Sequence, residues 1–161
     1  MLTHLKYVAG TSDYGIVYSN DIFLHGFADA DWGESVDDRR SISGYGFIFR
    51  VGLVSWLSKK QLAVSGSTTK AEYKAYYFAT FEALWLLLLL QELKVEVEVP
   101  LVVYSDSQSA MALARNPVYH SKVKHIAVSY HFTREQVNEG VIKLVYCASK
   151  GNLVESYYQS F

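Results

Sequence analysis

Hydrophobic and polar residues alternate along the first third of the chain in a pattern typical of half-buried strands. Segments 23–31, 45–50 and 53–60 are each predicted to be extended, and a tight turn at Val51–Gly52 joins the last two. A tight turn pairs its two strands antiparallel, and we expect all three strands to form an antiparallel meander. The first of them ends in acidic residues, as FLHGFADAD.

A long helix is predicted next, from Thr69 to Lys94. Thr69 is a suitable N-cap, and Glu72 three residues later would complete a capping box. After Phe78 the segment is apolar on nearly every side, which is typical of a helix at the centre of a domain. Its longest apolar run, ALWLLLLL, is too short for a bilayer, which requires about 20 apolar residues.

The rest of the chain alternates between strands and helices. Strands are predicted at 101–106 and 141–148, helices at 107–116 and 124–138, and a short helix or frayed end at 151–161. Strand–helix–strand units pair their strands in parallel. We therefore predict an α/β fold, a five-stranded mixed sheet with helices on both faces.

Length and composition are those of one globular domain. The chain has 161 residues, of which 50% are hydrophobic. Its net charge of −1 excludes a strong overall field toward nucleic acid or membranes, so any such binding must come from a local patch. The single Cys147 excludes an internal disulfide. Because no signal-peptide pattern is present, we expect an intracellular protein of the cytoplasm or nucleus, neither secreted nor bound to a membrane.

Four acidic residues fall where this layout brings them together. Asp29 lies on the first strand, Glu72 in the long helix, Asp106 at the end of the fourth strand and Glu155 in the C-terminal segment. If the first and fourth strands are neighbours, Asp29 and Asp106 lie close together. Clustered carboxylates repel one another unless cations neutralise them, and oxygen ligands suit Mg²⁺ or Mn²⁺. Two such ions can activate a water and stabilise a leaving oxygen in phosphodiester cleavage.

Each acid taken alone also has an ordinary structural explanation. Glu72 can serve only as the capping partner of Thr69, and Asp106 only as the strand end that caps the next helix. Asp29 can be a strand-end carboxylate, and Glu155 a solvated residue. Their combination and their order along the chain favour a shared site instead.

Five sequence blocks connect the chain to a known family. In order along the chain they are DADW, SKKQ, STTKAEY, SQSAMALARNP and KHIAVSYHFTRE. They resemble the ribonuclease H domain of copia-type LTR retrotransposon polyproteins, and the resemblance runs from about residue 2 to residue 156. LKYVAGTSDYGIVYS also resembles the segment that joins the reverse transcriptase to this domain. We therefore expect 1–20 to be a remnant of that link, 21–161 to be the ribonuclease H-like domain, and Met1 to lie within a former polyprotein.

The resemblance implies a metal-dependent endonuclease that hydrolyses the RNA strand of RNA/DNA hybrids. Asp29, Glu72 and Asp106 match the first three catalytic carboxylates of the family, and Glu155 stands where the family usually has Asp. Together they would hold two Mg²⁺ ions, with Mn²⁺ as the alternative. Asp31, on the strand face of Asp29, is the fallback candidate. The extra methylene moves the Glu155 carboxylate by about 1.5 Å, a displacement that lowers activity.

Three more positions depart from the family pattern. Lys70 replaces a usual acidic residue and puts a cation at a helix N-terminus, which is unfavourable with the helix dipole. Ala127 and Ser129 stand where the family usually has an acid and an arginine. These changes indicate impaired activity, as in a domesticated or decaying element.

The family setting also indicates where nucleic acid would bind. Local cations can contact phosphates even when the net charge is near zero, although a solvated charge cluster explains the same residues equally well. The candidates are Lys59, Lys60, Ser107, Gln108, Asn116, Lys122, Lys124 and His125.

Two other functions stay open from the sequence. A domesticated ribonuclease H-like module of weak or no catalytic activity would bind nucleic acid or a host protein partner, with the aromatic tail at 157–161 as a contact. An integrase-type enzyme would use Asp29, Asp106 and Glu155, but Glu72 on the long helix argues against it.

Overall fold

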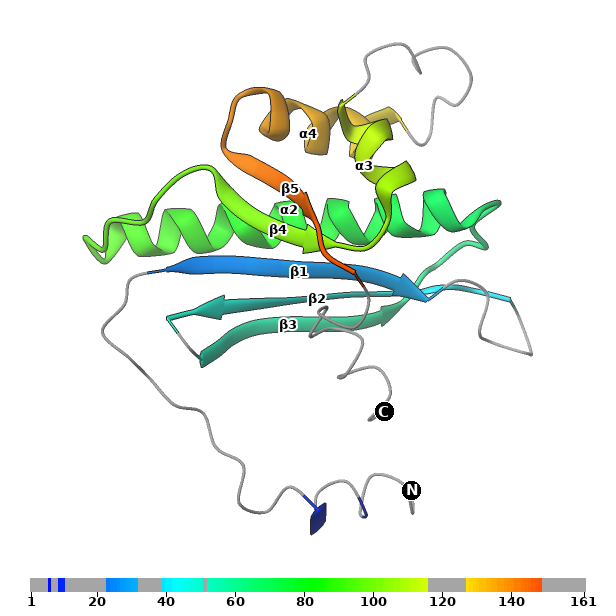
Figure 1. Cartoon of the computed structure of the whole chain (residues 1–161), viewed down its shortest axis with the longest axis horizontal. Helices are drawn as coiled ribbons and strands as arrows, with labels where there is room; N and C mark the ends of the chain where they lie inside the picture. Colours follow the sequence, from blue (N-terminus) through cyan, green and yellow to red (C-terminus); the bar gives the residue numbers. More distant parts are fainter. Residues whose placement is uncertain are drawn as a thin grey trace.

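Strands and helices alternate around one sheet in the described part of the chain. The computed structural model describes residues 23–31, 39–50, 52–115 and 127–148, and the isolated positions 6, 9 and 10. Five strands form the sheet in the order β3-β2-β1-β4-β5 (Figure 1). The strands are β1 Leu24–Asp31, β2 Ile42–Phe49, β3 Gly52–Lys60, β4 Leu101–Ser105 and β5 Ile142–Tyr146. The helices are α2 Thr68–Glu92, α3 Gln108–Arg115 and α4 Ala127–Asn138.

The sheet is mixed, as the sequence predicts. β2 runs antiparallel to β1 and β3, whereas β4 runs parallel to β1 and β5. β1 is therefore the central strand, and its pairing with β4 confirms that the first and fourth strands are neighbours. The turn after β2 lies one residue earlier than expected. Gly52 already pairs with Phe49, and Arg50 adopts a φ of 63°.

The hydrophobic core lies between the sheet and α2. Ala28 and Phe47 of the strands pack in one buried cluster with Tyr73 and Tyr76 of the helix. Gly26 is required beside the Phe47 ring, because a Cβ at position 26 would stand 2.5 Å from Cε1 of that ring. The site at the end of the sheet therefore rests on a tightly packed strand–helix interface.

The three helices pack against one another. α2 contacts β1 and β2, and both α3 and α4 contact α2, as expected of a central helix. The apolar second half of α2 is not buried on every side, however, because Phe81, Trp85 and Leu88 are more than half exposed. Between α2 and α4 the rings of Tyr73 and Tyr130 stack at 3.9 Å. The segment 151–161, expected to be a short helix or a frayed end, lies outside the described residues. No helix in the described ranges is long and apolar enough to span a bilayer.

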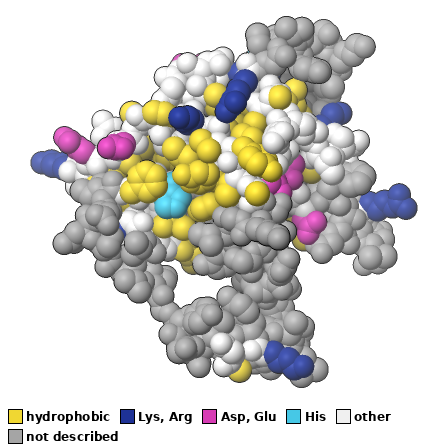
Figure 2. Space-filling model, viewed as in Figure 1, with side chains coloured by type: hydrophobic (Ala, Val, Ile, Leu, Met, Phe, Trp, Pro, Cys, Tyr) yellow, Lys and Arg dark blue, Asp and Glu magenta, His cyan; other side chains and the backbone are white. Residues whose placement is uncertain are grey.

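The face of β1 and β4 that is turned away from α2 carries aromatic side chains. Phe27 and Tyr104 stack with centroids 5.2 Å apart, and the His25 ring contacts both of them edge-on. Burial among these rings lowers the pKa of His25. Figure 2 shows hydrophobic side chains gathered over the strands in this view. This apolar face continues along β1 as far as Asp29, where the acidic residues begin.

Candidate active site

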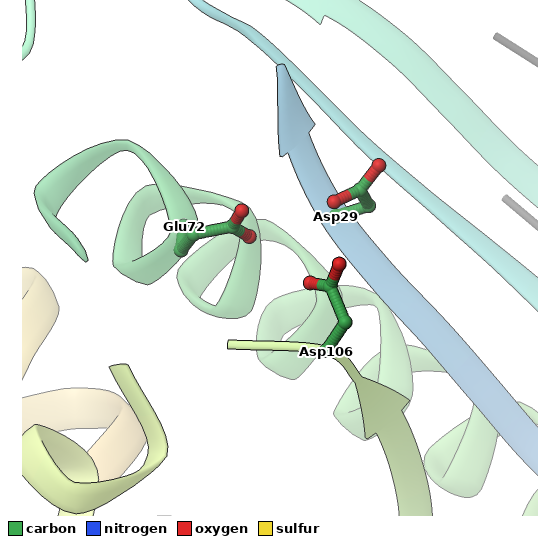
Figure 3. Close-up of side chains that lie close together, drawn as sticks. All are labelled: Asp29, Glu72 and Asp106. Atoms are coloured by element: carbon green, nitrogen blue, oxygen red, sulfur yellow. The ribbon is translucent and has the colours of Figure 1, made fainter. Parts of the chain in front are cut away.

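Three of the four predicted acidic residues come together at one end of the sheet. Asp29 lies near the end of β1, Asp106 directly follows β4, and Glu72 lies in the second turn of α2. One carboxylate oxygen from each residue lies within 4.8 Å of the other two. Figure 3 shows the three side chains directed toward one another. Parallel pairing explains the two aspartates, because it brings the carboxyl ends of β1 and β4 to the same edge.

Glu72 reaches this cluster because it is not engaged in capping the helix. The N-cap of α2 is Ser67, whose Oγ accepts a hydrogen bond from the backbone N–H of Lys70 at 3.3 Å. The prediction of Thr69 as the N-cap was therefore wrong. Lys70 occupies the third helical position, where the acidic partner of a capping box would stand. Glu72 lies beyond the cap, and its carboxylate is directed to the sheet instead (Figure 3).

Small side chains let α2 approach β1 closely at this point. Ala30 of β1 packs against Ala71 and Ala75 of α2 in a separate buried cluster. The backbone N–H of Ala30 donates a hydrogen bond to the Glu72 carboxylate. The alanines thus explain how a helical side chain comes within reach of Asp29.

The proton affinity of Glu72 is far from ordinary. Burial, followed by the negative charges of Asp29 and Asp106, raises the pKa of Glu72 from 4.5 to about 9. The hydrogen bond from Ala30 opposes this shift. The other carboxylate oxygen, Oε2, is buried and has no hydrogen-bond partner among the described residues.

These features fit a divalent cation. An unpartnered buried oxygen is costly, and a cation between the carboxylates would supply the missing partner and favour the ionised form of Glu72. All three available ligands are carboxylate oxygens, a donor set that suits Mg²⁺ or Mn²⁺.

Two further acids were expected near this cluster. Asp31 lies two residues after Asp29 on the same strand face, but it is not in the group of three whose oxygens converge. Its negative charge makes the smallest of the contributions that raise the pKa of Glu72. Glu155 lies outside the described residues.

Half of the residues expected to bind nucleic acid are described. Lys59 and Lys60 are exposed at the end of β3. Strand pairing aligns Lys60 with Ile42 and Ile42 with Asp31, so Lys60 lies on the sheet face of the aspartates and Lys59 on the face of α2. The other half of the expected residues lie outside the part of the chain that the structure describes; they are Asn116, Lys122, Lys124 and His125.

The segment after Asp106 begins α3 as predicted. The Oγ of Ser107 accepts a hydrogen bond from the backbone N–H of Ala110 at 3.3 Å, so Ser107 caps this helix. Gln108 is exposed in its first turn. Neither the capping bond of Ser107 nor the exposed position of Gln108 conflicts with a contact to sugar or phosphate.

Two buried residues beside the acids were missed by sequence reasoning. The Tyr76 hydroxyl donates to Ser105 Oγ at 2.8 Å and lies 3.1 Å from the Ser107 carbonyl, so it holds the chain on both sides of Asp106. Gln61 joins β2 to the start of α2. Tyr76 lies four residues after Glu72, on the same helix face, and this spacing is the signal that was available.

Comparison with solved structures identifies the architecture. The fold is similar to that of LC11-RNase H1 from compost, solved in complex with an RNA/DNA hybrid, at a TM-score of 0.56 and 14% identity over 83% of this chain and 91% of that one. The N-terminal RNase H domain of a Mycobacterium tuberculosis protein gives a TM-score of 0.54 at 12% identity, covering 83% of this chain and 88% of that one. The protein therefore has a ribonuclease H-like fold.

Sequence comparison shows to which proteins this chain is related. The retrovirus-related Pol polyprotein of transposon RE2 from Arabidopsis thaliana is 40% identical over 154 residues, 94% of this chain and 11% of its own length. That of transposon TNT 1-94 from Nicotiana tabacum is 41% identical over 149 residues, 92% of this chain and 11% of its own length. The chain is thus related over nearly its whole length to Pol polyproteins of plant transposons, and it spans about a tenth of them. No family model matches the chain.

Proposed function

We propose that this protein is a metal-dependent endonuclease that hydrolyses the RNA strand of RNA/DNA hybrids. The observation that carries the proposal is the convergence of Asp29, Glu72 and Asp106, with one buried Glu72 oxygen that has no hydrogen-bond partner in the described part of the chain. A ribonuclease H-like fold and Pol polyprotein relatives support the nuclease class. We assign residues 21–161 to this domain and 1–20 to a remnant of the linking segment.

The three carboxylates have separate tasks in this proposal. Asp29 and Asp106 are fixed by the paired ends of β1 and β4, and Glu72 closes the site from α2. With Glu155 as the fourth ligand they would hold two Mg²⁺ ions, or Mn²⁺ as the alternative. When bound, such ions supply an activated water and stabilise the leaving oxygen of the phosphodiester.

Substrate recognition would depend on the backbone and shape of the hybrid. The LC11 enzyme, which shares the fold, was solved with an RNA/DNA hybrid, and we extend that ligand class to this chain. Lys60 on the face of the aspartates is suitably placed for a phosphate, with Ser107 and Gln108 at the start of α3. Recognition of this kind reads shape and 2′-hydroxyl groups and not base sequence.

Cleavage of a labelled RNA/DNA hybrid in Mg²⁺ and in Mn²⁺ tests the proposal. We expect the wild type to cleave the RNA strand and Asp106→Asn to lose at least about 100-fold in rate, because one of the converging ligands is neutralised. Glu92→Gln, an exposed change at the far end of α2, is the control and should match the wild type.

A second variant examines the fourth ligand. If Glu155 holds metal with a displaced carboxylate, Glu155→Asp should raise the rate several-fold. Absence of cleavage by the wild type and by Glu155→Asp, in both metals and with hybrid binding intact, would reject the enzyme and leave a binding module.

A further inference from the structure

A buried polar network joins β2 to the first turns of α2. Gln61 directly follows β3, and its side chain is only 4% exposed. Its Nε2 donates to Ser43 Oγ at 2.7 Å and to the Ala71 carbonyl at 3.1 Å. Its Oε1 accepts a hydrogen bond from Ser65 Oγ at 2.6 Å. Both amide protons and the amide oxygen are therefore used.

The two serines that contact Gln61 are themselves buried. Ser43 is fully buried, and Ser65 is 4% exposed. The backbone N–H of Gln61 also donates to the Ser41 carbonyl at 2.8 Å, which fixes the residue to the start of β2. Buried hydrogen bonds of this kind define one geometry, because each group left without a partner would be costly.

The network leads directly to the candidate catalytic glutamate. Ala71, which accepts from Gln61, immediately precedes Glu72. The Glu72 carboxylate in turn accepts from the backbone N–H of Ala30, and Ala30 pairs with Ser43 across β1 and β2. The path from Gln61 through Ser43, Ala30 and Glu72 back to Ala71 is thus a closed ring of contacts around the base of one carboxylate.

We propose that Gln61 is a positioning residue that sets the Glu72 carboxylate against Asp29 and Asp106. This inference rests on the proposed nuclease function. The residues between β3 and α2 form no regular element, and the Ser67 cap fixes only the helix itself. Gln61 joins the helix start to the sheet within one residue of Glu72. Misplacement of a catalytic group by about 1 Å can cost 100-fold in rate.

A matched tether elsewhere on α2 separates positioning from general support. The Tyr45 hydroxyl, also on β2, donates to Glu82 Oε2 at 3.1 Å. Glu82 lies ten residues after Glu72, about 15 Å farther along the helix axis. Removing either side-chain donor loosens β2 from α2, but only Gln61 acts next to the carboxylate cluster.

The experiment compares Gln61→Met, which keeps the side-chain length, with Tyr45→Phe. For each protein we would measure kcat with saturating hybrid, the Kd for hybrid without metal, and Mn²⁺ affinity by calorimetry. We expect Gln61→Met to lower kcat by about 100-fold and Mn²⁺ affinity by about 10-fold, with hybrid Kd within about twofold of the wild type. Tyr45→Phe should lower the melting temperature and leave kcat and Mn²⁺ affinity unchanged.

Ser43→Ala is the second variant, because it removes one acceptor of Gln61 and keeps the bond to Ala71. It should lower kcat less than Gln61→Met does, and it decides the matter if Gln61→Met fails to fold. Equal kcat losses in Gln61→Met and Tyr45→Phe, or unchanged Mn²⁺ affinity in both network variants, would overturn the inference. A wild type that binds Mn²⁺ but cleaves no hybrid would refute the proposed function, while the affinity comparison would still test Gln61.

Discussion

Replacing Glu72 by Gln should make the metal-free protein more stable while it removes a metal ligand. In the folded state the pKa of Glu72 is raised from 4.5 to about 9, mainly by burial and then by the two aspartates. The unfolded chain therefore loses this proton near pH 4.5, and the folded protein retains it to about pH 9. The contribution of Glu72 to stability is fully present below pH 4.5 and is lost progressively as the pH rises toward 9.

The magnitude follows from that interval. A pH of 7 lies 7 − 4.5 = 2.5 units above the ordinary pKa of Glu72. At about 1.4 kcal/mol per unit, the folded state is disfavoured by about 3 kcal/mol relative to a neutral side chain of the same shape. Gln provides such a side chain, and its carbonyl oxygen can still accept the hydrogen bond from Ala30. The free energy of unfolding of Glu72→Gln should therefore exceed that of the wild type by about 3 kcal/mol at pH 7.

Urea unfolding in EDTA at pH 5, 7 and 8.5 measures this difference. The gap between Glu72→Gln and the wild type should widen with pH, and Glu92→Gln, an exposed change on the same helix, should stay within about 0.5 kcal/mol of the wild type. Burial also lowers the pKa of His25, but this effect is common to all three proteins and cancels in the comparison. Saturating Mg²⁺ should stabilise the wild type and not Glu72→Gln. A Glu72→Gln protein no more stable than the wild type at any pH in EDTA would refute the reasoning.

Three other changes test the packing, the site and the substrate surface. Gly26→Ala should lower the free energy of unfolding by about 1–3 kcal/mol in urea, because its Cβ would stand 2.5 Å from the Phe47 ring; an unchanged midpoint would contradict this. Tyr76→Phe should cost about 1 kcal/mol by the same assay and lower kcat, because the serines on either side of Asp106 lose its hydroxyl. Lys60→Ala should weaken hybrid binding and reduce the dependence of log Kd on log salt by about 1, with a smaller effect for Lys59→Ala; equal effects would remove the distinction between the two sheet faces.

The elements that could be predicted from sequence are those set by local patterns. β1, β2 and β3 follow from alternation and a short turn, and β4 from an apolar run that ends at Asp106. Asp29 and Asp106 could be paired in advance because two parallel strands that are neighbours end at the same edge. Glu72 was expected in the same cluster from its place in the long helix, and the family resemblance then matched it to a catalytic carboxylate.

The start of α2 could not be predicted in the same way. Ser67 and Thr69 are both suitable caps by composition, so the choice depends on the chain entering the helix. That entry is fixed by the Gln61 network, whose partners at positions 43 and 71 are 18 and 10 residues away in sequence. An amide side chain after a strand carries no local signal of such contacts. The exact geometry of Glu72 was therefore beyond sequence reasoning, although its identity was not.

The energetics of Glu72 argue that the acidic cluster is kept for a ligand. Native domains are stable by about 5–15 kcal/mol, so a side chain that disfavours the folded state by about 3 kcal/mol at neutral pH is a large burden. Capping would not explain it, because Ser67 caps α2 and Glu72 lies beyond the cap. A cation held at 100 times its Kd contributes about 2.7 kcal/mol, enough to offset most of that burden. The same arrangement that weakens the metal-free protein would thus make its stability depend on the ion that the proposed reaction requires.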